Sequence, residues 1–150
     1  MLIVTFDLDN QRYAIELGVV ERVVPIVAIS PLPQAPAVVL GAMNLHGLVV
    51  PVLDLRRRFG KQDRPYSLSA HLLIARTRRG IIALPVDEAV GVSEIDAPLA
   101  VRPNLILPEA GQIAGLVAVT DGLLFICDLE AFLTLDEEEE LTAAVAELHL

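Results

Sequence analysis

The stretch 41–59, GAMNLHGLVVPVLDLRRRF, constrains the fold most, because it joins two apolar runs through one tight polar break. Between the runs, His46-Gly47 supplies the glycine that a two-residue hairpin turn needs. The second run, 48–53, is apolar without alternation, which predicts a strand that is covered on both faces. Asp54 follows as a helix N-cap, and Gly60 ends the short helix. The stretch therefore predicts a β-hairpin that leads into a helix.

The same pattern returns in the second half of the chain. Gly41, Asp54, Leu55 and Phe59 match Gly115, Asp128, Leu129 and Leu133 at one offset (115 − 41 = 74), and residues 13–23 match 82–92 at another (82 − 13 = 69). We therefore expect a single domain over 1–150 with two pseudo-repeated lobes, matched over about 13–59 and 82–133. The alternative is that any two hairpins of a Val- and Leu-rich chain look alike. Two separate cores are expected, one around Val4, Phe6, Ile15, Val50 and Val52, the other around Leu73, Leu84, Val86, Leu124 and Ile126.

Composition indicates an aliphatic interior. Hydrophobic residues make up 54% of the 150 residues, whereas aromatic residues make up 4% and tryptophan is absent. Such a chain suits β-lobes filled with Val, Ile and Leu. No apolar run approaches the roughly 18 residues of a membrane span, and the N-terminus has no secretory signal pattern. The single cysteine, Cys127, lies in an apolar strand and is expected in the core. Because one cysteine cannot form an intrachain disulfide, we expect a cytoplasmic location.

The charge distribution bears on the choice of partner. A net charge of −9 argues against nucleic acid and against an anionic membrane as partners. Most basic residues nevertheless gather between positions 56 and 79, with few aromatic or amide side chains among them to read bases. We interpret them as a solvated basic surface; they are Arg56, Arg57, Arg58, Lys61, Arg64, Arg76, Arg78 and Arg79.

The remaining segments complete a mainly β pattern. Residues 2–8 alternate as a half-buried strand, and further hairpins are expected over 71–86 and 113–127. Pro98, Pro103 and Pro108 break up a loop between them. An acidic helix is predicted over about 136–148, with Leu141, Val145 and Leu148 as an apolar stripe that docks on the β-lobes; a stripe for a partner is the alternative.

The sequence contains few arrangements of residues that are typical of a catalytic or metal site. The sequence has no phosphate-binding glycine loop and no nucleophile elbow, and its three histidines, His46, His71 and His149, lack metal-ligand spacing. Aspartates at the strand-to-helix junctions are explained better as caps than as acids or bases. We predict no catalytic residues, no metal and no cofactor. An interaction module is favoured over an enzyme.

Four motifs resemble one family, the CheW-like adaptor domain of bacterial chemosensory arrays. Gly41-x-x-Asn44-Leu45-x-Gly47 followed by Val50-Pro51-Val52-x-Asp54-Leu55-Arg56 is similar to its G-x-x-N-L-R-G-x-x-x-P-V-x-D-L-R run. Tyr13-Ala14-Ile15 with Val20-Glu21-x-Val23 resembles its Y-A-I-x-x-x-x-V-x-E-V region, with the acidic residue displaced. Val86-Asp87-Glu88-x-Val90-x-Val92 resembles its V-D-x-V repeat, and Asp121-Gly122 with Asp128-Leu129 its last hairpin.

The resemblance implies a mainly β fold of two intertwined five-stranded SH3-like β-barrels with short helices and a C-terminal helix. It implies a non-enzymatic scaffold that couples the cytoplasmic tips of chemoreceptors to the regulatory domain of a CheA-type histidine kinase. The kinase is expected at barrel ends and the receptor hairpin in the groove between barrels. Nucleic acid and direct membrane insertion are not expected. A CheW-like adaptor of a pilus or other non-flagellar system, or a self-assembling structural module, are the alternatives.

Partner-binding residues are expected at two kinds of position. His46 replaces the arginine of the family's N-L-R-G motif, and at neutral pH histidine is mostly uncharged whereas arginine is always a cation. An adaptor poor in aromatic residues is also expected to bind through exposed aliphatic side chains. The candidates are Val20, Glu21, Val23, His46, Gly47, Val86, Asp87 and Val90.

Overall fold

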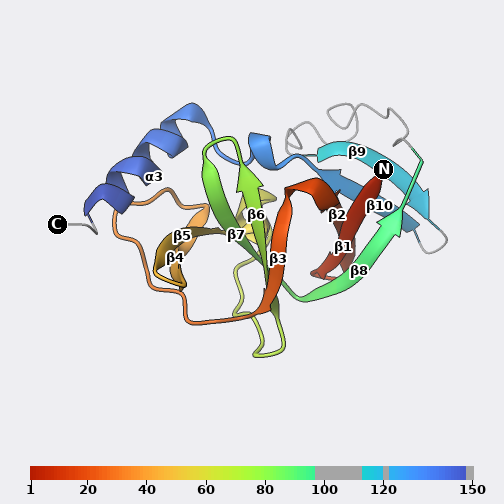
Figure 1. The fold of residues 1–150 in the computed structure, drawn as a ribbon, viewed down its shortest axis with the longest axis horizontal. Coiled ribbons are helices and arrows are strands. Elements are labelled where there is room, and N and C mark those ends of the chain that lie inside the picture. The colour runs from red at the N-terminus through yellow and green to blue at the C-terminus, as the bar shows by residue number, and fades with distance from the viewer. Residues whose placement is uncertain (97–112, 120–121, 148–150) are drawn as a thin grey trace.

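The computed structural model describes residues 1–96, 113–119 and 122–147, and its strands form two five-stranded sheets (Figure 1). One sheet has the order β8-β1-β2-β10-β9 and the other β3-β6-β7-β5-β4. The chain enters the second sheet after β2 and returns after β7, so the two lobes are intertwined. The mainly β, two-lobed fold is confirmed. The strands are β1 Leu2–Leu8, β2 Gln11–Glu16, β3 Val20–Pro25, β4 Val39–Leu45, β5 Leu48–Leu53, β6 His71–Thr77, β7 Gly80–Val86, β8 Glu88–Glu94, β9 Ile113–Val119 and β10 Gly122–Cys127.

Helices are short except at the C-terminal end. The predicted cap at Asp54 is present, because its carboxylate accepts a hydrogen bond of 2.8 Å from the Arg56 backbone N–H. Asp128 caps the second junction in the same way, but only a 3-10 turn follows there instead of the expected helix. The loop predicted around the prolines of 98–108 lies outside the described residues. The helical elements are a 3-10 turn Leu17–Val19, α1 Leu55–Arg58, a 3-10 turn Leu129–Ala131, and α3 Leu135–Glu147.

Strand pairing repeats between the two sheets. β2 and β10 pair in parallel at Ala14 and Ile126, and β7 and β5 pair in parallel at Ala83 and Val52. Ala14 and Ala83 are related by the first offset (83 − 14 = 69), and Val52 and Ile126 by the second (126 − 52 = 74). The two parallel pairs therefore occupy equivalent positions in the two lobes. Bulges in β8 opposite β1 and in β3 opposite β6 also stand at equivalent places. This common register supports a duplicated lobe.

The described residues form three hydrophobic clusters instead of the two predicted. All ten predicted core residues are buried, but they are grouped differently. Successive side chains of a strand point to opposite faces, so Ile3 belongs to the first lobe and Val4 to the cluster between lobes. Both faces of β1 are therefore covered, which corrects the prediction of a half-buried strand. This shared core contains, from both sheets, Val4, Phe6, Ile15, Leu73, Leu84 and Val86.

Gly41 allows the second sheet to close on itself. The backbone of Ser30, beyond β3, exchanges two hydrogen bonds of 2.9 and 2.8 Å with Ala42 in β4. A β-carbon on Gly41 would collide with the Ser30 carbonyl oxygen. The glycine that opens the stretch 41–59 is thus needed for close backbone approach.

The C-terminal helix docks on the lobes, as its apolar stripe predicts. Leu141 and Ala144 are buried in the shared core, and Val145 packs against it. Leu148, the third predicted contact, lies outside the described residues. Two ion pairs hold the start of the helix, Arg58 to Glu137 at 2.6 Å and Arg79 to Glu138 at 2.7 Å. The stripe is used within the chain.

Glu137 gives this docking a pH dependence. Burial raises its pKa, but a backbone hydrogen bond from Thr134 and the pairing with Arg58 outweigh burial and hold the pKa below the ordinary 4.5. The ionised carboxylate therefore stabilises the fold above about pH 4.5, and this contribution is lost as pH falls through the lowered pKa. We expect Glu137→Gln to lower the free energy of unfolding at pH 7 by about 1 kcal/mol.

Urea unfolding followed by circular dichroism at pH 7 and below pH 4 tests this expectation. The loss in free energy of unfolding caused by Glu137→Gln should be smaller at the lower pH. Glu139→Gln, an exposed change on the same helix, should lower the free energy of unfolding little at either pH. An equal deficit at both pH values would contradict the assigned role.

Candidate partner-binding surface

β3 and β8 are edge strands of the two sheets, and they converge at one residue. His71 pairs with Pro25 at the end of β3, and its Nδ1 accepts a hydrogen bond of 3.3 Å from the backbone N–H of Ala89 in β8. From there the two strands diverge as the arms of a V on one face of the protein (Figure 1). Each lobe contributes one arm, so the face between the arms belongs to both lobes.

Aliphatic side chains line this face. Val23 of β3 lies directly opposite Leu73, and Val92 of β8 directly opposite Val4; both of these partners belong to the shared core. Val23 is nevertheless 41% exposed and Val92 58% exposed, so they form the open rim of that core. Leu2, two residues before Val4 and therefore on the same side of β1, is 50% exposed.

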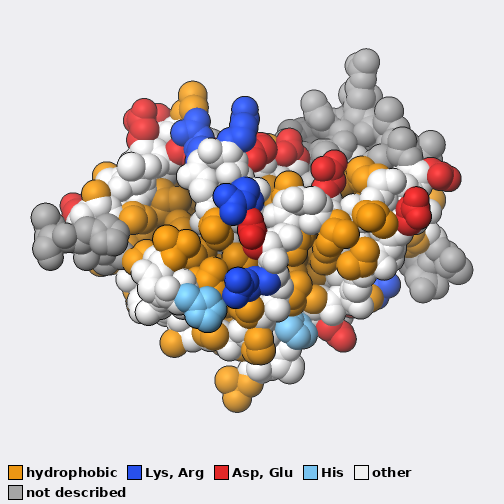
Figure 2. All heavy atoms as spheres, in the orientation of Figure 1, with side chains coloured by type: hydrophobic (Ala, Val, Ile, Leu, Met, Phe, Trp, Pro, Cys, Tyr) orange, Lys and Arg blue, Asp and Glu red, His pale blue; other side chains and the backbone are white. Residues whose placement is uncertain are grey.

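We call this surface the interlobe face and define it by Leu2, Val20, Val23 and Val92. Val20 is half-buried against the shared core. Figure 2 shows hydrophobic side chains gathered over β1 and β8, beside β3. An apolar patch that combines two sheets is typical of a protein-binding surface.

The predicted aliphatic contacts are only partly on this face. The expectation that Val86 is exposed is wrong: its side chain is 0% exposed, because it points from β7 into the shared core. Val90, 44% exposed, is the bulge residue of β8 and lines a separate hollow of about 860 Å³ on the first lobe. Glu21 holds the equivalent bulge position in β3 and pairs with Arg76 at 2.7 Å.

Asp87 belongs to a partly buried ionic cluster at the junction of β7 and β8. Its Oδ1 accepts a hydrogen bond of 2.5 Å from Arg56, and its Oδ2 accepts one of 2.8 Å from the backbone N–H of Asp9. Arg56 also donates to Asp9 Oδ1 at 2.8 Å. The guanidinium therefore joins the β1–β2 turn, α1 and the start of β8, and Asp87 has its carboxylate oxygens engaged within the chain.

Arg56 corrects the prediction of a wholly solvated basic surface, since its side chain is 1% exposed. Its guanidinium lies 4.0 Å from the ring centre of Tyr66, whose hydroxyl donates to Asp54 at 3.0 Å. Burial, together with the charge of Asp54, raises the pKa of Tyr66, so the hydroxyl stays a donor. Arg76, Arg78 and other members of the predicted set do lie on the surface.

His46 and Gly47 form the β4–β5 turn. Both have positive φ, 51° and 90°, and the Gly47 N–H donates to the Asn44 side chain at 2.7 Å. This is the glycine-requiring turn that the sequence predicts. The His46 side chain is exposed, and its Nε2 lies 3.4 Å from Nη1 of Arg22 in β3. Arg22 was not among the predicted residues.

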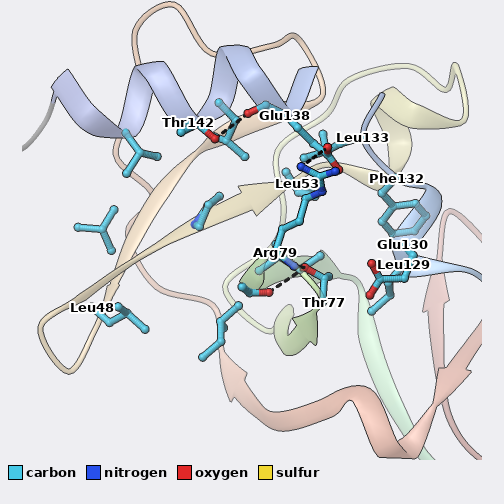
Figure 3. A pocket seen from close by; sticks show the side chains of 17 residues that line it. Leu48, Leu53, Thr77, Arg79, Leu129, Glu130, Phe132, Leu133, Glu138 and Thr142 are labelled. Atoms are coloured by element: carbon cyan, nitrogen blue, oxygen red, sulfur yellow. Dashed lines mark hydrogen bonds and ion pairs between the residues drawn. The ribbon is translucent and has the colours of Figure 1, made fainter. Parts of the chain in front are cut away.

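Two further features of the described residues lie outside the interlobe face, Cys127 and a hollow under α3. Cys127 is buried as predicted, and burial raises the pKa of its thiol. No group of three metal-ligating side chains occurs within the described part of the chain. A hollow of about 570 Å³ lies under α3 and is lined mostly by apolar side chains, with the Arg79–Glu138 ion pair reaching across it (Figure 3).

Two β-lobes with an exposed aliphatic face between them define a protein-binding adaptor domain. The family model of the CheW-like domain matches residues 2–139, and the chain belongs to this family. The function is that of a chemotaxis coupling adaptor, consistent with the relatives and the solved structure to which the chain is similar.

Three comparisons document the similarity. The chemotaxis protein CheW of Klebsiella aerogenes is 26% identical over 146 residues, which cover 96% of this chain and 87% of the relative. CheW of Thermotoga maritima is 28% identical over 124 residues, covering 83% and 81%. The crystal structure of the scaffolding protein TtCheW from Thermoanaerobacter tengcongensis superposes with a TM-score of 0.77 at 28% identity, covering 91% of this chain and 89% of that one.

None of the helices among the described residues is both long and apolar enough to cross a membrane.

Proposed function

We propose that the protein is a non-enzymatic scaffold that couples chemoreceptors to a CheA-type histidine kinase on the cytoplasmic side of the membrane. The observation that carries the proposal is the interlobe face, where both lobes contribute exposed aliphatic side chains above one shared core. Membership of the CheW-like family and the relatives' names, chemotaxis protein and scaffolding protein, support it.

The interlobe face suits the helical tip of a receptor. Apolar side chains of a helix recur at i, i+3, i+4 and i+7 and so form a stripe, which can lie between the arms of β3 and β8. Val23 and Val92, one from each arm, would contact opposite sides of that stripe. Because these strands are held by the shared core, the face is formed before the partner arrives, and little ordering entropy is lost on binding.

A scaffold needs a second surface for the kinase. The hollow on the first lobe offers one, since it is lined by Val90, Leu123 and Val119, which are 44%, 50% and 42% exposed. It lies on the opposite side of the β8–β1 pairing from the shared core, where Ile3 and Leu124 also face. We assign the kinase regulatory domain to this end of the first lobe.

Competition binding tests the two assignments. Immobilised protein is offered the host's receptor cytoplasmic tip, the kinase regulatory domain, or both. We expect each partner to bind, and the retention of either to be unaffected by saturation with the other. Mutual exclusion would contradict separate surfaces, and failure of both partners to bind would contradict the proposed function.

A further inference from the structure

Arg22 differs from the other described arginines. Eight arginines pair with a carboxylate of the chain itself within 4.0 Å, as expected for a protein with a net charge of −9. Arg22 is exposed and pairs with no carboxylate of the described residues. The paired arginines are Arg12, Arg56, Arg57, Arg58, Arg64, Arg76, Arg78 and Arg79.

The position of Arg22 is set by contacts from two directions. Its backbone lies opposite Ile74 in the β3–β6 pairing, and its Nη1 lies 3.4 Å from His46 Nε2. β3 and β4 are the two edges of the second sheet, so the contact joins a sheet edge to the turn that follows the other edge. A guanidinium carries five N–H donors and no acceptor. An unprotonated imidazole nitrogen can accept one of these hydrogen bonds, which leaves the other donors available.

The contact between Arg22 and His46 joins two positions at which this chain departs from the family motifs. The V-x-E-V pattern has an acidic residue where Arg22 stands, and N-L-R-G has an arginine where His46 stands. In this chain the permanent cation is therefore on the edge strand, and the turn carries an imidazole. Leu48, which follows this turn two residues after His46, is 50% exposed and lines the hollow under α3, so exposed aliphatic surface lies close to the turn. Arg22 thus combines an unpaired charge with a nearby apolar contact area.

We propose that Arg22, positioned by His46, recognises a carboxylate of a protein partner that docks at this end of the second lobe. The occupant is an acidic protein segment: its carboxylate takes the free guanidinium donors in a bidentate pair, and its apolar side chains cover Leu48. Charge complementarity favours this occupant, since Arg22 pairs with no carboxylate of the described residues and so attracts one from a partner locally, although the chain has a net charge of −9. The inference rests on the proposed function, which makes the receptor tip and the kinase domain the partners to examine.

Affinities of the receptor tip and of the kinase regulatory domain test the proposal, measured by isothermal titration calorimetry at two salt concentrations. For one of the two partners, we expect Arg22→Gln to weaken binding about 10-fold and Arg22→Glu about 100-fold, with a smaller salt dependence for Arg22→Gln. Arg76→Gln, which removes an exposed arginine already paired with Glu21, is the matched control and should leave both affinities within about 2-fold.

His46 is tested as a positioning residue by a double-mutant cycle. His46→Ala should weaken the same partner in the wild-type background and have no further effect in the Arg22→Gln background. Thermal unfolding by circular dichroism verifies that each variant is folded. Unchanged affinities of folded Arg22→Glu for both partners would overturn the proposal while leaving the adaptor function intact. Wild-type protein that binds neither partner would instead overturn the function and this inference together.

Discussion

Replacing Arg56 by alanine is expected to lower the free energy of unfolding by about 3–5 kcal/mol. The substitution leaves the carboxylates of Asp9 and Asp87 facing each other without the buried cation that joins them at 2.8 and 2.5 Å. It also opens a cavity beside Tyr66. Arg64, which contacts the same two carboxylates from a side chain that is 54% exposed, can compensate only in part.

Urea unfolding at pH 7, followed by circular dichroism, measures this effect. Arg56→Lys keeps the charge but not the planar fork, so we expect it to fall between wild type and Arg56→Ala. Arg76→Ala, whose pair with Glu21 is exposed, is the control and should cost less than about 1 kcal/mol. A cost for Arg56→Ala as small as that of the control would show that the ionic cluster is not needed for stability.

Placing a carboxylate on the interlobe face is expected to weaken receptor binding about 30-fold or more. Val23→Asp and Val92→Asp each bury a charge beneath the partner without a counterion, which costs about 2 kcal/mol at a central interface position. The thermal midpoint should change little, because these side chains are 41% and 58% exposed in the free protein.

Two further variants give this prediction its controls. Leu68→Asp, in the segment before β6 where the side chain is 96% exposed, should change neither affinity nor midpoint. Val86→Asp, at a position that is 0% exposed, should lower the midpoint strongly, because it places a charge in the shared core. Wild-type affinity in both Val23→Asp and Val92→Asp would contradict the placement of the receptor on this face.

Local patterns predicted the hairpins and caps well. His46-Gly47 defines its turn through the backbone conformation that glycine tolerates, and Asp54 caps α1 through a hydrogen bond to a residue two positions away. Such features depend on neighbours in the sequence. The predicted hairpin over 71–86 was likewise confirmed, since β6 and β7 are joined by the two-residue turn Arg78-Arg79, after which Gly80 begins β7.

Features that depend on distant residues could not be predicted in this way. Arg56 and Arg57 are adjacent and look alike in sequence, yet only Arg56 is buried. Its guanidinium pairs with Asp9 and Asp87, which lie 47 and 31 positions away along the chain. The exposure predicted for Val86 was wrong for a similar reason, because the first lobe covers its face of β7 in the shared core. Val92 could have been found: it lies 69 positions after Val23, the offset already visible in the sequence.

Co-sedimentation tests most directly whether this protein physically couples receptor to kinase. Membrane vesicles or nanodiscs that carry the host's receptor cytoplasmic domain are mixed with the CheA-type kinase, with or without the protein, and then pelleted. We predict that the kinase pellets in increasing amounts as the protein is added, and that Val23→Asp abolishes the increase. A kinase that pellets equally with and without the protein, or that pellets in neither case, would contradict the proposed coupling.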